Sequence, residues 1–343
     1  NGDKNSWEIG TPTTAINHAY SGANCIATKL NDNYNPNENS ALISPCFDFS
    51  QLKNPIIKFY LWNITEPNKD GAVMQYSNNG GLDWHNLGDI DNGINWFNAS
   101  EILSVPGTSG TGWSGQLHVG WVEARHHLRD IIGYDNVRFR VAFASDNVIN
   151  LDGFAIDDIW IGEHNKMVML EHFTNASSDQ SATTDPALNQ IVEGMPLTVM
   201  AAHYHTDFPG NDPFNAQNPL PSAIRTFYYG TTAVPTTVMD GNQFNNQTSG
   251  LLNNPKLIEK RALSDPPFSI AIQKNVSGSN ISVNATITAN QEIVAHEITA
   301  HVLLVEKLVT TVTGNNGQIR FENVVRNMLP NSAGTTYNVA WAA

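Results

Sequence analysis

The chain has 343 residues, a formal net charge of −14 and only 15% charged residues. This length exceeds what one ordinary hydrophobic core supports, so two or three domains are expected. The negative charge argues against nucleic-acid binding, because phosphate backbones are bound by clustered lysine and arginine. No stretch approaches the roughly 18 apolar residues of a membrane-spanning helix. No signal peptide is recognisable at Asn1, so a mature or trimmed product is expected.

The cysteine content consists of Cys25 and Cys46 alone. Asparagine, threonine, serine and glycine take the place of charged residues, as in many secreted β-rich proteins. In an oxidising compartment a pair of cysteines commonly forms a disulfide. We therefore predict a Cys25–Cys46 disulfide and a secreted or outer-surface location, with two buried thiols in a cytosolic protein as the alternative.

Residues 1–163 have the pattern of short strands separated by glycine-rich turns. In the run 137–143, the residues Val137, Phe139, Val141 and Phe143 alternate with two arginines. Period-two alternation places the apolar side chains on one face of a half-buried antiparallel strand. Several such strands predict a β-sandwich or jelly roll.

Seven short motifs follow one another along this segment. They are Trp7–Pro12, Ala19–Gly22, Leu42–Pro45, Phe47–Phe49, Tyr76–Trp84, Gly112–Gly115 and Asp152–Ile159. Together they resemble the MAM-like, choice-of-anchor J or cleaved-adhesin jelly rolls of bacterial surface and secreted proteins. The resemblance implies an all-β module that binds a protein or sugar or spaces other domains, and some relatives hold a structural calcium.

Carboxylates in this segment are candidates for that calcium. Asp157 and Asp158 could supply hard oxygen ligands together with Asp48 or Glu8 from a facing strand. The alternative is that one aspartate caps a turn and the other is solvated.

Tryptophans of the same segment are candidates for sugar contacts. An exposed Trp84, Trp96 or Trp113 could stack on a sugar ring, whereas tryptophans more often pack in a core or at its rim. We predict Trp84 and Trp113 as binding residues.

Residues 166–265 change to an alternation of strands and helices. Strands are predicted at 166–170 and 197–203, and helices at 186–193 and 222–229. This order indicates an α/β layer. The sequence Val234-Pro235-Thr236 before a strand resembles the cis-proline loop of thioredoxin folds, in which Pro235 would face the redox site.

Four motifs of this segment resemble the outer-membrane-protein-28-related group of thioredoxin-like surface proteins. They are Leu170–Thr174, Ala202–His205, Arg225–Tyr228 and Val234–Gly241. Members of that group often carry Phe-Thr-Gly-x-x-Cys-x-x-Cys, which aligns Ser178 and Ser181 with the two cysteines. Serine forms no disulfide, so the resemblance implies a degenerate, redox-inactive domain. Natural loss of the cysteines and their engineered replacement are both open.

Histidines at the end of the second strand are candidate metal ligands. His203 and His205 would share one face of the strand and, with Asp207 or Asp212, could bind zinc or copper. The alternative is a strand end with hydrogen-bonded histidines, because no third ligand has a fixed spacing.

Residues 266–343 contain period-two runs that predict an antiparallel β-sandwich. The run 321–330 resembles the C-terminal β domain of the same group, in which another hairpin follows. The sequence in hand is therefore expected to be truncated, with a type IX secretion sorting domain beyond it.

Taken together, the sequence predicts a multidomain, mainly β protein. A jelly roll (1–163) precedes a thioredoxin-like α/β domain (166–265) and a β-sandwich (266–343). The expected function is non-enzymatic adhesion or recognition of a protein or glycan at the cell surface, with calcium as the candidate cofactor and no cofactor as the alternative. The alternatives are a thiol–disulfide oxidoreductase or isomerase whose cysteines were replaced, and an accessory module of a larger secreted hydrolase.

Overall fold

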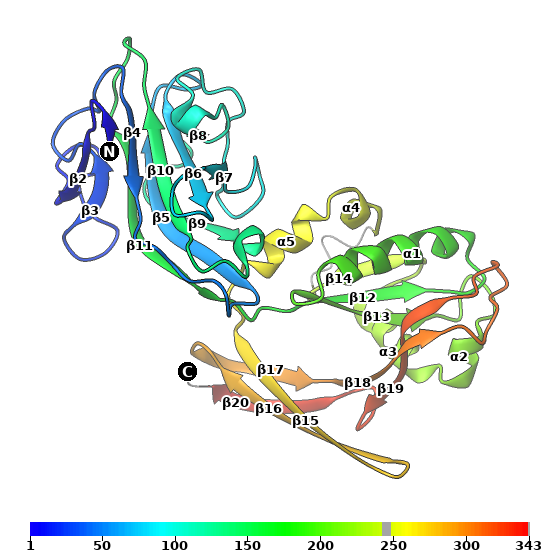
Figure 1. The fold of residues 1–343 in the computed structure, drawn as a ribbon. Coiled ribbons are helices and arrows are strands. Elements are labelled where there is room, and N and C mark those ends of the chain that lie inside the picture. Colours follow the sequence, from blue (N-terminus) through cyan, green and yellow to red (C-terminus); the bar gives the residue numbers. More distant parts are fainter. Residues whose placement is uncertain (242–247, 342–343) are drawn as a thin grey trace. The chain divides into compact units, whose positions relative to one another are not determined.

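The computed structural model describes residues 1–241 and 248–341 (Figure 1). The protein is mainly β, with several sheets. It divides into two compact units, Asn1–His164 and Asn165–Ala343. The first unit ends beside the predicted boundary at residue 163, whereas the two later segments lie together in the second unit. No helix of the described residues is long and apolar enough to cross a membrane.

The first unit consists of two antiparallel sheets. One has the order β1-β4-β10-β6-β7, with β8 also paired to β6, and the other has the order β2-β3-β11-β5-β9. The strands are β1 (Gly2–Asp3), β2 (Trp7–Gly10), β3 (Cys25–Thr28), β4 (Asn39–Ile43), β5 (Pro55–Ile64), β6 (Gly71–Ser77), β7 (His85–Asn86), β8 (Trp113–Ser114), β9 (Val122–His127), β10 (Arg138–Ala144) and β11 (Gly153–Glu163). Two short 3₁₀ helices, η1 (Pro106–Thr108) and η2 (Arg129–Ile131), lie between strands.

The core of the first unit lies between these two sheets. Phe59 of β5, Met74 of β6 and Phe154 of β11 belong to the same buried cluster. In β10 the alternation predicted from the sequence is present, since Phe139 and Phe143 are buried while the two arginines are partly exposed. The apolar face of each strand thus packs against the opposite sheet.

The second unit is built on one mixed sheet with the order β14-β12-β13-β19-β18. Its strands are β12 (Val168–Thr174), β13 (Val199–His205), β14 (Thr236–Met239), β18 (Val302–Val309) and β19 (Phe321–Leu329). The helices are α1 (Asp179–Gly194), α2 (Pro213–Gln217), α3 (Leu220–Tyr229), α4 (Thr248–Asn253) and α5 (Lys256–Ala262). Figure 1 shows α1, α4 and α5 on one face of this sheet and α3 on the other.

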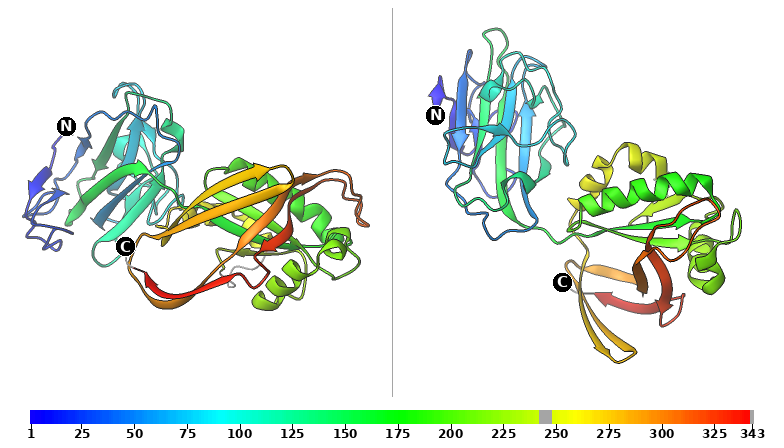
Figure 2. Two further views of the ribbon diagram at one scale, coloured as in Figure 1. Left: turned by 90° about the horizontal axis from the view of Figure 1, so that it is seen from below. Right: turned by 45° about the vertical axis from the view of Figure 1, so that its right-hand side comes forward.

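The strands after residue 266 are divided between the central sheet and two ribbons. β18 and β19 complete the central sheet, and β13 pairs with β19 in parallel. β15 (Phe268–Ser277) pairs with β16 (Asn280–Ala289), and β17 (Ile293–Ala300) pairs with β20 (Thr335–Trp341), each as a two-stranded sheet (Figure 2). This differs from the separate sandwich predicted from the sequence. Period-two alternation marks a strand but does not specify its partner.

Candidate functional site

The two serines at the predicted redox positions lie at the start of α1. Ser178 is the N-cap residue, and its hydroxyl accepts a hydrogen bond from the backbone N–H of Ser181 at 3.2 Å. Serine is a favoured N-cap because this bond satisfies a free amide of the first turn. The helix therefore begins at Asp179, and the start predicted near Pro186 is wrong.

Both serines are covered by the loop between β18 and β19. The Asn316 side chain donates to the Ser178 carbonyl at 2.8 Å, and its backbone N–H donates to the Ala176 carbonyl at 3.0 Å. Ser178 is 6% exposed and Ser181 is fully buried. The Val234–Pro235 peptide bond is cis, as the sequence predicts. The start of α1 and the cis-proline loop are thus present, but the two serine positions carry no thiol and are not open to the surface.

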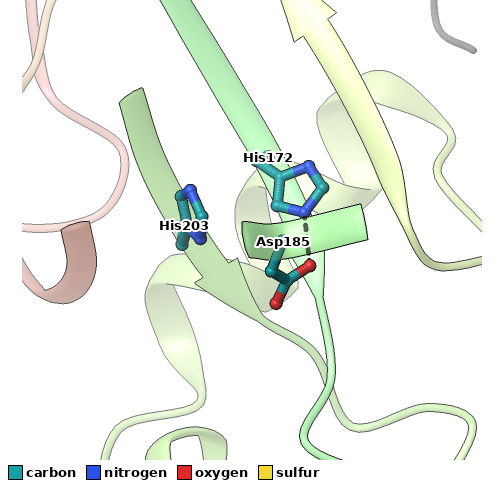
Figure 3. Close-up of side chains that lie close together, drawn as sticks. All are labelled: His172, Asp185 and His203. Atoms are coloured by element: carbon teal, nitrogen blue, oxygen red, sulfur yellow. Dashed lines mark hydrogen bonds and ion pairs between the residues drawn. The ribbon is translucent and has the colours of Figure 1, made fainter. Parts of the chain in front are cut away.

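A cluster of His172, Asp185 and His203 lies inside the second unit, behind the start of α1. Figure 3 shows the carboxylate of Asp185 next to both imidazole rings. His172 and His203 are opposite each other in the parallel β12–β13 pair, and α1 supplies Asp185. The Nε2 atom of His172 is 2.9 Å from Oδ1 of Asp185, and the two ring centroids are 4.8 Å apart. Local sequence patterns do not reveal this cluster, because His172 and His203 become neighbours only through the register of β12 against β13.

Hydrogen bonds fix two members of the cluster, while one nitrogen of His203 has no partner. Thr237 Oγ1 is 2.9 Å from His172 Nδ1, and the Thr174 hydroxyl donates to Asp185 Oδ2 at 2.7 Å. His203 is 2% exposed, and its Nε2 is buried without a hydrogen-bond partner. An unpaired buried polar atom lowers the stability of the folded protein, and such atoms are rare in native structures. The Nε2 atom of His203 is one of them.

The environment sets the charge of this cluster. Burial, together with the nearby His172, holds the pKa of His203 well below its ordinary value, so this imidazole is neutral. Burial alone would raise the pKa of Asp185, but its hydrogen bond and electrostatic interaction with His172 outweigh burial and lower this pKa to about 2. Asp185 is therefore ionised across the physiological pH range.

The metal ligands predicted around His205 are not brought together. His205 Nδ1 is 2.8 Å from Oδ2 of Asp212, but that carboxylate is already used locally. Asp212 caps α2 by accepting from the N–H groups of Phe214 and Asn215, and it also accepts from Ala176. Asp207 is exposed to solvent. Among the residues described, His203 shares a possible metal group with His172 and Asp185, and not with His205.

The predicted Cys25–Cys46 disulfide is not formed. Cys25 is buried in β3 beside Ala27 and Trp62, whereas Cys46 is exposed and follows β4 in the opposite sheet. Burial raises the pKa of the Cys25 thiol to about 11, which disfavours the reactive thiolate.

The carboxylates predicted to bind calcium do not form one site. Asp157 accepts hydrogen bonds from the backbone N–H groups of Ser21 and Asp158, and Asp48 accepts one from Ser50. Glu8 accepts from the Leu30 N–H and lies 3.5 Å from Lys29 Nζ. These contacts match the alternative of turn-capping acids. Calcium binding itself stays a prediction.

A different set of acids gathers in the first unit. Carboxylate oxygens of Glu66, Asp70 and Asp146 lie within 4.8 Å of one another. Asp70 is fully buried, and it accepts hydrogen bonds from the Tyr34 hydroxyl at 2.7 Å and from the Asp146 N–H at 2.7 Å. Burial raises the pKa of Asp70 from 3.8 to about 6, because the two hydrogen bonds only partly offset desolvation.

This raised pKa predicts a pH-dependent loss of stability in the first unit. The folded state binds the Asp70 proton more tightly than the unfolded state, so its contribution is complete below about pH 4 and is lost as the pH rises through about 6. Relative to Asp70→Asn, we expect the wild type to lose about 1–3 kcal/mol over this window. Urea unfolding of both proteins from pH 4 to pH 8 measures it. The prediction would be contradicted if the free energy of unfolding of the wild type, minus that of Asp70→Asn, stayed constant or increased from pH 4 to pH 8.

Tryptophans differ strongly in their exposure. Trp113 is fully buried and Trp96 is 3% exposed, so neither can stack on a sugar, and the prediction for Trp113 is wrong. Both rings fill the space between the two sheets. Trp84 is partly exposed, but the guanidinium of Arg140 lies 4.4 Å from its ring centroid.

A groove of about 470 Å³ lies over both sheets of the first unit. Its lining includes Asn5, Trp7, Ile26, Leu42, Ser44 and Arg138. Trp7 packs against the main core cluster, and it was not predicted as a binding residue. The Nε1 atom of Trp7 and the Nε atom of Arg138 are buried nitrogen donors without hydrogen-bond partners. The groove thus combines an aromatic ring and apolar walls with the polar side chains of Asn5, Ser44 and Arg138.

Comparison with known proteins gives distant similarities in structure. No protein-family model and no curated protein matches the chain. The structure of HBP35 of Porphyromonas gingivalis aligns with a TM-score of 0.42 and 14% identity over 52% of this chain and 62% of that one. This chain therefore spans less than two thirds of the HBP35 structure.

Two adhesin domains align as well. The K1 cleaved adhesin domain of Lys-gingipain from P. gingivalis aligns with a TM-score of 0.27 and 13% identity over 48% of this chain and 86% of that domain. The K2 cleaved adhesin domain of Lys-gingipain aligns with a TM-score of 0.29 and 16% identity over 46% of this chain and 83% of that domain. Similarities this weak define neither a family nor a function.

Proposed function

We propose that this chain is a secreted or outer-surface binding protein without enzymatic activity, and that its groove recognises a glycan. The groove carries the proposal. Concave sites with apolar and aromatic walls and a few convergent polar groups are the usual form of small-ligand sites.

The chemistry of the groove favours a sugar over a purely apolar ligand. The Trp7 ring and the side chains of Ile26 and Leu42 offer surface for the C–H face of a sugar ring. The Asn5 amide and the Arg138 guanidinium can bond hydroxyl or carboxylate oxygens.

The serines at the start of α1 support a non-enzymatic function. A serine hydroxyl stays protonated at neutral pH and cannot exchange disulfides. The hydroxyl of Ser178 is also occupied as the helix cap. The surrounding framework nevertheless keeps oxidoreductase ancestry as the alternative, which a pair of cysteine substitutions tests.

The variant Ser178→Cys/Ser181→Cys is expected to remain inactive in insulin reduction. Both positions are buried beneath the loop that carries Asn316, so a protein disulfide could not reach them. Its rate should equal that of the wild type, with thioredoxin as the positive control. Activity with a defined reduction potential would show that the site retains oxidoreductase function and would contradict the non-enzymatic assignment.

Glycan recognition is tested with the full chain on a glycan array, followed by titration of any ligand found. Arg138→Gln should weaken binding about tenfold, the effect of losing one charge-assisted hydrogen bond. Arg140→Gln is the matched control. Arg140 lies on the same strand as Arg138 but does not line the groove. Its Nε donates a hydrogen bond to the Gln75 side chain at 2.8 Å.

An affinity change of about tenfold for Arg138→Gln, with binding by Arg140→Gln kept within about twofold, supports the proposed site. Equal losses in the two variants would place recognition elsewhere on the protein. An array without any bound glycan would contradict the sugar assignment and direct the search to a protein partner.

A further inference from the structure

We propose that His172, His203 and Asp185 form a buried binding site for a divalent transition-metal ion, with zinc as the expected occupant. The site lies within the second unit and is independent of the groove proposed for glycans. Its three side chains come from β12, β13 and α1, so a bound ion would connect the sheet to the helix.

The ligand set has the composition and spacing of a zinc site. Two imidazole nitrogens and one carboxylate oxygen lie within 4.8 Å of one another. Zinc takes histidine nitrogen and aspartate oxygen at about 2.0–2.2 Å, and sites with three protein ligands complete a tetrahedron with water. The rings of His172 and His203 both lie beside the Asp185 carboxylate in Figure 3. Small side-chain rotations would place the three donor atoms around one ion.

The second observation is the unpaired nitrogen of His203. Its Nε2 is buried without a hydrogen-bond partner, and the His203 side chain shares a cluster with the Asp185 carboxylate and the His172 imidazole. Leaving this polar nitrogen buried and unpaired costs free energy of folding. A metal ion would accept the free lone pair of a neutral imidazole and remove this cost.

Outer hydrogen bonds hold the other two ligands in orientation. The Nδ1–H of His172 can donate to Thr237 Oγ1 at 2.9 Å, which leaves Nε2 free to bind a metal. Thr237 Oγ1 in turn lies 3.0 Å from Thr248 Oγ1. Asp185 Oδ2 accepts from Thr174 at 2.7 Å and from Gln318 at 3.3 Å, while Oδ1 faces His172. Such partners orient metal ligands and tune their basicity.

The charge and hardness of the donors select the metal class. Imidazole suits zinc, copper, iron and nickel, whereas calcium and magnesium require six or more oxygen ligands or water. One carboxylate with two neutral imidazoles leaves a divalent ion with a net charge of +1 in the site. The described residues offer no thiol within this cluster, which disfavours the soft monovalent copper ion.

The test uses the full chain after chelator treatment. Equilibrium dialysis with Zn²⁺ and elemental analysis should give one tightly bound ion per chain. Bound Co²⁺ should show the visible absorption of a tetrahedral site. The melting temperature should rise with Zn²⁺ concentration, because a ligand that binds only the folded state stabilises it.

Three variants make the test specific. His203→Phe should lower zinc affinity at least about 100-fold. Removal of a residue that only hydrogen-bonds a metal ligand costs up to about 100-fold, and removal of a ligand itself should cost no less. Its metal-free form should be as stable as the metal-free wild type, because phenylalanine leaves no unpaired nitrogen. Asp185→Asn should also lose zinc. His205→Gln is the matched control. It removes a buried histidine of the same strand whose imidazole is paired with Asp212, and it should keep zinc binding.

Zinc uptake by the wild type and by His205→Gln, with loss in His203→Phe and Asp185→Asn, would establish the site. If Asp185→Asn does not fold, His203→Phe decides alone. A wild type that takes up no stoichiometric metal would overturn the proposal. Uptake that His203→Phe leaves unchanged would also overturn it and assign the metal to surface histidines.

Discussion

Replacing Glu171 with alanine is expected to destabilise the second unit by about 3–5 kcal/mol. The Glu171 carboxylate accepts two hydrogen bonds from Arg225, at 2.8 and 2.7 Å, and another from the Tyr229 hydroxyl. All three residues are at most 9% exposed. The alanine variant would leave the Arg225 guanidinium buried and without its carboxylate, which costs far more than the net contribution of an intact pair.

The measurement is urea unfolding followed by far-UV circular dichroism. All five described α-helices lie in the second unit, so the helical signal reports on it. Glu306→Ala is the matched control. Its pair with Arg326 is partly exposed, so its loss should cost at most about 1 kcal/mol.

The double variant Glu171→Met/Arg225→Met distinguishes the contribution of the ion pair from the cost of leaving one of its charges buried and unpaired. Removing both charges leaves no unpaired ion, so the double variant should lose much less stability than Glu171→Ala. A loss below about 1 kcal/mol for Glu171→Ala would contradict the structural role of this network.

Replacing Trp113 with alanine is expected to cost the first unit about 3–5 kcal/mol. The Trp113 ring is fully buried, and the centroids of the Phe97 and Trp96 rings lie 4.7 and 5.1 Å from its own. Phe59 and Phe154 contact it as well. Alanine would leave a large cavity between the two sheets and remove several favourable aromatic pairs.

Thermal and urea unfolding, followed by the fluorescence of the remaining tryptophans, measure this change. Trp84→Ala is the control, because that ring is partly exposed and its cation–π contact with Arg140 contributes only about 0.5–1 kcal/mol. Trp113→Phe should restore part of the loss by refilling part of the cavity. Equal costs for Trp113→Ala and Trp84→Ala would contradict the assignment of Trp113 to the core.

Local patterns predicted much of the secondary structure. The alternation in 137–143 predicted β10 and its buried face, and the strand predicted at 166–170 overlaps the first half of β12. Runs of apolar residues identify strands because burial of one face is the main stabilising term. The predicted start of the helix at Pro186 is wrong because proline is common in the first turn of a helix. In α1 this proline lies in the interior, and the N-cap is Ser178.

Candidate sites were harder to predict, because they depend on which strands become neighbours. His203 was paired with His205 from their spacing, yet its neighbour in space is His172 on the adjacent parallel strand. Asp70 and Asp146 are far apart in sequence and meet only where their loops converge. The partly buried Trp7 gave no local signal that distinguished it from the buried Trp113.

The sequence by itself determined the mainly β class, the faces that strands bury and the absence of thiols at Ser178 and Ser181. These features depend on residue type and short-range periodicity. Tertiary structure decided that β18 and β19 join the sheet of β12 and β13, that Cys25 and Cys46 lie apart, and that two histidines and an aspartate meet in the interior. Strand partners and register are chosen by long-range packing, which no single local segment encodes.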